Sequence, residues 1–410
     1  MVRKAFCVIT QRSSLKSNFP REFRTRIYMP IHSSTLRTGL PCLTGRLCTR
    51  FAIFAVCWIA IRLIATENPA LVTERIFGPE TSTGPYKHPA SFTELDNGDL
   101  YLVFFSGKGE YRDNSAAVFG SRLKQGGHHW SAPVAIARNP FHSLGNAVVW
   151  QAPDGLVWLF YVTRYGETWS RSRISAKISR DRARTWSEPF QVTFDPGTMV
   201  RSRPIALADG HCLLPVYREY GEDTEVDSVE NASFFLRYDS AKRSWIGSNP
   251  VHSRLGNIQP AVVELDPGRL VAYCRRGGDY KGRPDGWMVR TESTDGGRTW
   301  TPGVDAPFPN PNAAVDFIAL QSKACLLVYN DSFTHRTPLT VALSVDGAAT
   351  FPWRRNLAES PEGDYGYPTA IQTRDGRIQV LYTSDERSVI RRAIFRESWV
   401  RHVVKSPDGH

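Results

Sequence analysis

Residues 293–300 read Ser-Thr-Asp-Gly-Gly-Arg-Thr-Trp, and this short pattern decides the expected fold because it recurs along the chain. In such a stretch the Ser and Asp side chains can bond backbone amides, Gly permits the bend, and Trp is buried between strands. Residues 179–186 repeat the pattern without the glycine, residues 344–351 form a weaker copy, and Trp130 and Trp245 end degenerate copies. The final aromatic residues of the copies are 56, 59, 55 and 51 residues apart. Each copy therefore predicts a closed turn in one repeated unit.

A second pattern, a tight turn followed by an apolar strand, interleaves with the first. It occurs six times, with its turn position at Gly98, Gly155, Gly210, Gly268, Lys323 and Gly376, at steps of 57, 55, 58, 55 and 53 residues. Glycine allows the positive φ of a tight hairpin. Six units of about 55 residues fit blades of four short strands each. The sequence thus predicts an all-β fold, a six-bladed β-propeller over residues 67–400, whose last blade is completed by the chain near residues 68–85.

Nearly all of the net charge of +11 in 410 residues lies in the N-terminal segment. Residues 1–65 hold 11 Lys and Arg and a single acidic residue, Glu22, whereas the rest of the chain carries a net charge of +1. A nearly neutral body offers no bulk electrostatic support for binding a phosphate backbone. The charge distribution therefore argues against a nucleic-acid partner.

The basic segment ends in a run of eleven uncharged apolar residues, 51–61, which Arg46 and Arg50 precede. The run is too short for a comfortable membrane span of about 20 residues, whereas a charged flank and a short apolar core are typical of a signal peptide. We expect residues 1–66 to be an export leader, with cleavage after Ala65, and the protein to be periplasmic or extracellular. An uncleaved membrane anchor and a misassigned start are the alternatives.

The cysteines predict neither a disulfide framework nor a metal site. Four of the seven lie in the leader, and Cys212, Cys274 and Cys325 lie in or beside apolar strand-like runs of the body. Such residues behave as small buried hydrophobes, and no Cys/His spacing suggests zinc. We expect a monomer without a cofactor, ending in a tail at residues 401–410.

The Ser-x-Asp-x-Gly-x-Thr-Trp turns resemble the Asp boxes, or BNR repeats, of the sialidase (neuraminidase) superfamily over residues ~80–395. The resemblance implies three cations that bind a substrate carboxylate. Lys87, in Tyr-Lys-His-Pro, stands where the family has its first arginine. Arg275, with Arg276 beside it, and Arg336 match the second and third.

The same resemblance assigns the reacting groups. Tyr365, in Asp-Tyr-Gly-Tyr-Pro, aligns with the family's nucleophile, and Gln259 stands where the family has the glutamate that activates it. A Gln can orient a phenol but cannot accept its proton. Asp113 fits the loop of the acid/base residue, with Glu110 as an alternative, and Arg203 is expected to be a polar positioning residue.

These residues imply a sialidase-like glycoside hydrolase of exo-α-sialidase type that acts on an acidic sugar. A lyase or hydrolase for a uronic-acid glycan is an alternative, because a cationic cleft would acidify the α-proton and Tyr365 or His88 could serve as the base. A third possibility is a glycan-binding propeller without catalysis.

Overall fold

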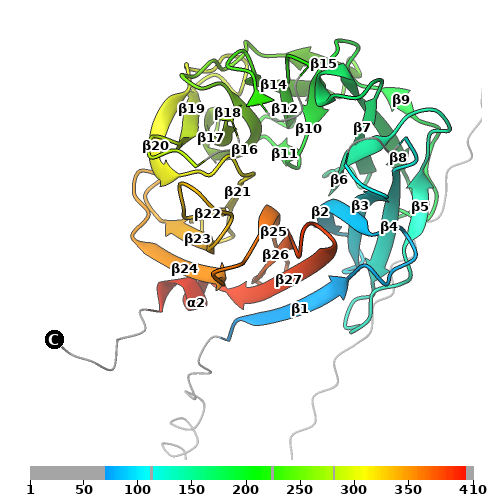
Figure 1. Cartoon of the computed structure of the whole chain (residues 1–410). Coiled ribbons are helices and arrows are strands. Elements are labelled where there is room, and N and C mark those ends of the chain that lie inside the picture. Colours follow the sequence, from blue (N-terminus) through cyan, green and yellow to red (C-terminus); the bar gives the residue numbers. More distant parts are fainter. Residues whose placement is uncertain (1–69, 111–113, 223–225, 280–281, 403–410) are drawn as a thin grey trace, which may run out of the picture. The chain divides into compact units, whose positions relative to one another are not determined.

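The computed structural model describes residues 70–110, 114–222, 226–279 and 282–402. Six antiparallel sheets succeed one another along this part of the chain and lie around a central axis (Figure 1). Five of them have four strands and the third has five. The fold is therefore the six-bladed β-propeller that the repeats predicted.

The first three blades occupy the first half of the ring. Blade 1 consists of β2 (Tyr86–Glu94), β3 (Leu100–Gly107), β4 (Ala117–Leu123) and β5 (Val134–Ala137). Blade 2 consists of β6 (Leu144–Gln151), β7 (Val157–Arg164), β8 (Ser172–Ser179) and β9 (Phe190–Gln191), with the short 3-10 helix η1 (Trp169–Arg171) between β7 and β8. Blade 3 consists of β10 (Thr198–Val200), β11 (Ile205–Ala206), β12 (Cys212–Arg218), β14 (Ala232–Asp239) and β15 (Ser244–Gly247).

The last three blades complete the ring. Blade 4 consists of β16 (Asn257–Asp266), β17 (Arg269–Arg276), β19 (Trp287–Ser293) and β20 (Val304–Pro309), and β13 (Val226–Asp227) pairs with β18 (Gly278–Asp279) outside the blades. Blade 5 consists of β21 (Asp316–Ala319), β22 (Cys325–Asn330), β23 (Leu339–Ser344) and β24 (Trp353–Ala358). Blade 6 consists of β25 (Gly366–Gln372), β26 (Arg377–Ser384), β27 (Val389–Arg396) and β1 (Val72–Phe77), and the helix α2 (Glu397–Arg401) follows β27.

The ring closes because its first strand joins its last blade. β1 pairs antiparallel with β27, with Val72 opposite Ile394. The chain near residues 68–85 was expected to make this connection. Pairing removes the open edge that β27 would otherwise present.

The recurring turns are held by the side chains that the sequence pattern suggested. Ser293 Oγ lies 2.8 Å from Asp295 Oδ1, and the Thr299 hydroxyl donates to Asp295 Oδ2 at 2.6 Å. Trp300 is buried and stacks on Phe235 of blade 3, with ring centroids 3.7 Å apart. The turn thus positions an aromatic side chain that packs blade 4 against its neighbour.

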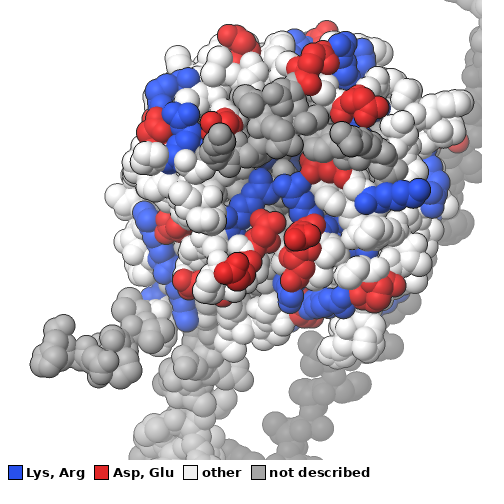
Figure 2. Space-filling model, viewed as in Figure 1, with Lys and Arg blue, Asp and Glu red and all other residues white. Residues whose placement is uncertain are grey.

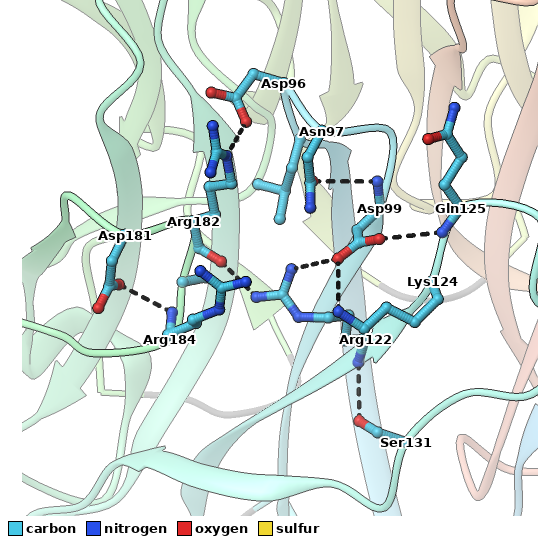
Figure 3. Close-up of polar contacts among 12 residues, drawn as sticks. Asp96, Asn97, Asp99, Arg122, Lys124, Gln125, Ser131, Asp181, Arg182 and Arg184 are labelled. Atoms are coloured by element: carbon cyan, nitrogen blue, oxygen red, sulfur yellow. Dashed lines mark hydrogen bonds and ion pairs between the residues drawn. The ribbon is translucent and has the colours of Figure 1, made fainter.

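Charged side chains at the turns form contacts within blade 1 and between blades 1 and 2 (Figure 3). Asp99 of blade 1 is buried and pairs with Arg122 at 3.1 Å and Lys124 at 3.2 Å. Arg122 also donates to the backbone carbonyl of Arg182, which lies in the recurring turn of blade 2, and the Arg182 side chain pairs with Asp96 of blade 1 (Figure 3).

The hydrophobic core lies between neighbouring blades. In one cluster, Leu326 and Val341 of blade 5 pack with Val380 and Ala393 of blade 6. Strands that are apolar on both faces, such as β7 and β22, supply these layers because both faces are covered by other blades.

Four of the inner strands bulge near the axis, and this feature positions the candidate site. Pairing loses register in β2, β6, β16 and β25, between His88 and Ala90, Gly145 and Val148, Ile258 and Ala261, and Gly366 and Thr369. In three of these bulges a residue other than glycine has positive φ, namely Asn146 (41°), Gln259 (54°) and Tyr367 (55°). A bulge re-aims the side chain that it carries, and these three side chains line one pocket.

The predicted leader, residues 1–66, and all but the first two residues of the predicted tail lie outside the described residues. Among the residues that are described, no helix is long and apolar enough to cross a bilayer.

The three cysteines of the body are free thiols. Cys274 and Cys325 are buried and Cys212 is partly buried. Burial raises the pKa of the Cys274 thiol to about 12 and that of the other two to about 11.

Candidate active site

One pocket brings the inner ends of the blades together, and we call it the tyrosine pocket. Its lining comes from blades 1 to 4 and blade 6 and consists of His88, Phe105, Glu110, Asn146, Trp169, Met199, Tyr217, Glu219, Ile258, Gln259, Arg275 and Tyr367. Basic side chains gather in the hollow near the middle of the ring, and acidic side chains lie beside them (Figure 2). A concave site with a few convergent polar groups is the usual form of a ligand site.

Tyr367 is buried in this pocket, and four guanidinium groups surround its ring. The Cζ atoms of Arg336, Arg201, Arg387 and Arg275 lie 5.5, 5.6, 5.8 and 5.9 Å from the ring centroid. Arg275 also donates from Nη1 to the phenol oxygen at 3.1 Å. The four arginines come from blades 5, 3, 6 and 4, so only the closed ring brings them together.

The arginines change the acidity of the phenol. Burial raises the pKa of Tyr367, but the charges of Arg275, Arg387 and Arg336 outweigh burial, and the net pKa lies below the usual value of 10. The phenolate is the form that the cations favour. A tyrosine in this setting is a stronger nucleophile or base at neutral pH than an ordinary surface tyrosine.

Arg387 is held by Glu110 and Tyr86. Its Nη1 pairs with Glu110 Oε2 and lies 3.3 Å from the Tyr86 hydroxyl, which itself donates to Glu110 at 2.8 Å. The other oxygen of Glu110 accepts from Trp169 Nε1 at 3.3 Å. Both oxygens are therefore engaged, and the geometry suits Glu110 to fixing Arg387 more than to giving a proton to a substrate.

Gln259 lines the pocket with Tyr367 and not with the expected Tyr365, and its hydrogen-bond partners are Arg275 and the hydroxyl of Tyr217. Its Oε1 accepts from Arg275 Nη1 at 3.3 Å, and its Nε2 lies 3.4 Å from the hydroxyl of Tyr217. Asn146 donates to the same hydroxyl at 3.0 Å. None of these amides can remove a proton from Tyr367.

His88 packs edge-on against Tyr367, with ring centroids 3.8 Å apart. Burial and the charges of Arg387 and Arg336 hold its pKa well below 6.5, so the imidazole is neutral. Thr383 lies 3.3 Å from Nδ1 and donates its own hydroxyl proton to Gly366, which leaves Nδ1 as the donor. Nε2 is buried and has no hydrogen-bond partner within the described residues, so its lone pair is not engaged by another group of that part of the chain.

Four of the predicted binding residues are not among the side chains that line the tyrosine pocket, namely Lys87, Arg203, Arg276 and Arg336, although Arg336 lies 5.5 Å from the Tyr367 ring centroid. Lys87 is buried and its amine donates to the carbonyl of Gly84. Arg276 donates to the carbonyl of Asn310 at 2.8 Å, and Arg203 donates to that of Ala370 at 2.7 Å. Lys87 alternates with His88 along β2, so the two side chains face opposite sides of the strand.

Tyr365 also lies elsewhere, in a groove between blades 5 and 6 where its ring is 6.0 Å from that of Tyr382. It precedes the first residue of β25, and the bulge in that strand directs Tyr367 to the arginines instead. The tyrosine of the site is thus two residues further on than the sequence alignment suggested. Asp113, the predicted acid, lies outside the described residues.

Sequence reasoning missed Tyr367, Arg387 and Arg201. Tyr367 stands in the quoted stretch Asp-Tyr-Gly-Tyr-Pro, and the choice between its two tyrosines depends on the bulge. Arg387 ends a turn whose residues Asp385, Glu386 and Arg387 all have positive φ without a glycine, and no sequence signal marks it. In the part of the chain that the structure describes, no group of three His, Cys, Asp or Glu side chains could hold a metal ion.

A six-bladed ring with recurring Asp-box turns and a tyrosine among arginines at its axis defines a sialidase-like propeller. The chain matches the model of the BNR repeat-like domain over residues 98–380, and it belongs to that family. No curated protein sequence matched the chain.

Solved structures with similar folds are mostly sialidases. A Hadza microbial sialidase, Hz136, has a TM-score of 0.68 at 17% identity, covering 80% of this chain and 69% of its own. The NanB sialidase of Streptococcus pneumoniae has a TM-score of 0.66 at 11% identity, covering 80% and 71%. A protein of unknown function from Dyadobacter fermentans has a TM-score of 0.65 at 19% identity, covering 80% and 99%. At these identities the likeness concerns the fold.

Proposed function

We propose that the protein is a sialidase-like glycoside hydrolase that acts on an acidic sugar. The observation that carries this proposal is Tyr367, a buried phenol with four guanidinium groups within 6 Å of its ring centroid. Arg275 and Arg336, with Arg387 in place of the predicted Lys87, would bind the sugar carboxylate. Guanidinium groups suit this role because they bind carboxylates through two parallel hydrogen bonds.

In this mechanism the oxygen of Tyr367 attacks the anomeric carbon and forms a bond to it while the bond to the leaving-group oxygen breaks. The leaving oxygen takes a proton from an acid, for which Asp113 remains the predicted residue. Water then cleaves the bond to the tyrosine, with the same acid accepting a proton. The positive field of the arginines would stabilise the phenolate where Gln259 cannot accept its proton.

A second candidate is a lyase that acts on a uronate glycan. The observation that favours it is the buried neutral His88, whose Nε2 has no partner among the described residues and lies in the same pocket. This imidazole, or the phenolate of Tyr367, would remove the proton next to a carboxylate that the arginines bind. The bond to the leaving sugar oxygen would then break with formation of a double bond, and the leaving oxygen would take a proton from water.

The test compares the wild type with Tyr367→Phe and Tyr365→Phe on a fluorogenic α-sialoside and on uronate polysaccharides. Release of the fluorophore identifies a sialidase, and an unsaturated product that absorbs in the near ultraviolet identifies a lyase. We expect Tyr367→Phe to lower turnover by about 100-fold or more, whereas Tyr365→Phe should leave it almost unchanged. Binding of acidic sugars without turnover would overturn both enzymatic proposals in favour of a glycan-binding propeller.

A further inference from the structure

A buried arginine next to the tyrosine pocket holds the strand that carries Tyr367. Arg201 follows β10 directly, and its Nη2 donates to the carbonyl of Pro368 at 2.7 Å while its Nη1 donates to the hydroxyl of Thr369 at 3.1 Å. Thr369 in turn donates to the carbonyl of Ala90 in blade 1 at 2.9 Å. Arg201 is buried and both of its terminal nitrogens donate to β25, so its guanidinium binds the protein.

The carboxylate of Asp316, from blade 5, holds Ala370, the next residue of β25. Asp316, the first residue of β21, accepts the backbone N–H of Ala370 at 2.6 Å and that of Phe317 at 3.0 Å. It is 5% exposed and attracts the charge of Arg201. A buried guanidinium is costly without a nearby anion, so Asp316 supports Arg201 as well as β25.

The conformation of Tyr367 explains why the strand needs these contacts. The tyrosine has a φ of +55°, and pairing between β25 and β26 loses register from Gly366 to Thr369. A left-handed conformation is unfavourable in a bulky residue and persists only where the surrounding structure imposes it. The residues that directly follow the tyrosine are the ones that Arg201 and Asp316 bind.

We infer that Arg201 and Asp316 are positioning residues, which fix residues 368–370 so that the phenol of Tyr367 stays among the arginines of the pocket. This inference rests on the proposed function, because it assumes that Tyr367 takes part in the reaction. Neither residue touches the substrate in this scheme; each acts through the backbone of β25.

The experiment uses Arg201→Gln, which removes the two donors to β25, and Thr369→Val, which removes only the hydroxyl that Arg201 binds. Thr369→Ser retains the hydroxyl and serves as the conservative rescue. Arg392→Gln is the matched control. Arg392 is a buried arginine of blade 6, the blade that contains β25, and it pairs with Glu74 at 2.7 Å.

Two measurements separate positioning from general stability. The first is the ultraviolet titration of the Tyr367 phenol, obtained as the difference between each variant and the same variant carrying Tyr367→Phe. The second is the separate measurement of kcat and KM on whichever substrate the sialoside and uronate assays identify. We expect Thr369→Val, which leaves every charge in place, to raise the phenol pKa by about one unit and to lower kcat about tenfold at pH 7 with KM changed less than about threefold. Arg201→Gln also removes a charge 5.6 Å from the Tyr367 ring centroid, so it should raise the phenol pKa by about two units. Thr369→Ser and Arg392→Gln should leave the titration unchanged.

An unchanged phenol titration in folded Thr369→Val protein would overturn the inference, even if Tyr367 is essential. Full activity of Tyr367→Phe would instead overturn the proposed function, whatever the titration shows. If Arg201→Gln does not fold, Thr369→Val and Thr369→Ser still decide the matter because both retain Arg201 and Asp316.

Discussion

Removing the charge of Arg336 should raise the pKa of the Tyr367 phenol. The guanidinium carbon lies 5.5 Å from the ring centroid. Two unit charges at that separation interact by about 3 kcal/mol at an effective dielectric constant of about 20. Because 1.36 kcal/mol corresponds to one pKa unit, Arg336→Gln should raise the phenol pKa by about 2 units, and Arg336→Lys, which retains the charge, by much less.

The assay is the pH dependence of kcat at saturating substrate, together with direct ultraviolet titration of the phenol. Saturation separates the effect on the phenol from weaker binding of a carboxylate, which would appear in KM. Below the phenol pKa, kcat of Arg336→Gln should fall up to about 100-fold, since each unit of pKa lowers the phenolate fraction tenfold.

Equal pH profiles for the Gln and Lys variants would refute the reasoning, because the charge of Arg336 would then not control Tyr367. Arg275→Gln provides an independent check. Its guanidinium lies 5.9 Å from the same ring centroid, so a shift of nearly the same size is expected, and a shift in the opposite direction would contradict the electrostatic account.

Three further predictions concern the neighbouring amide, the recurring turns and the N-terminus. Gln259→Glu places a base beside Tyr367 and should raise hydrolysis of an α-sialoside by about 100-fold; a fluorogenic assay that shows no gain would contradict this. Burial raises the pKa of Asp295, but hydrogen bonds from Thr299 and Ser293 lower it to about 2, so the fold is stabilised above pH ~4 and loses this contribution as the pH falls toward 2. Asp295→Ala should therefore lower the free energy of unfolding by about 1 kcal/mol at neutral pH and by less at pH 3, as measured by chemical denaturation, and an equal loss at both pH values would argue against ionic stabilisation. N-terminal sequencing of exported protein should begin near residue 66, and an intact residue 1 would favour the uncleaved anchor.

The number of blades could be predicted because each blade contains its own turn chemistry. The turn glycines recur at almost constant steps, and the Asp-box contacts are local, as between Ser293 and Asp295. The positions of Arg275 and Arg336 near one tyrosine also followed from the sequence, through the resemblance to sialidases.

The remaining site could not be predicted because it depends on backbone geometry that the sequence does not display. Simple alternation places residues 365 and 367 on the same face of a strand, yet Tyr365 precedes β25 and Tyr367 lies in its bulge. The cation near Tyr367 that was expected to be Lys87 is Arg387 under the proposed function, and Arg387 lies in a turn in which three successive residues other than glycine have positive φ. The residue types of that turn do not predict its backbone conformation.

The pairing of β1 with β27 also sets the order in which the molecule can be completed during synthesis. Val72 and Ile394 lie about 320 residues apart in the sequence, so β1 remains without its partner strand until nearly the whole chain has left the ribosome. Earlier blades can form from local hairpins, but the edge of blade 6 can be covered only by a contact between the two ends of the ring. A chain that ends before β27 therefore retains β1 without its partner, and this exposed strand would favour aggregation over a smaller active propeller.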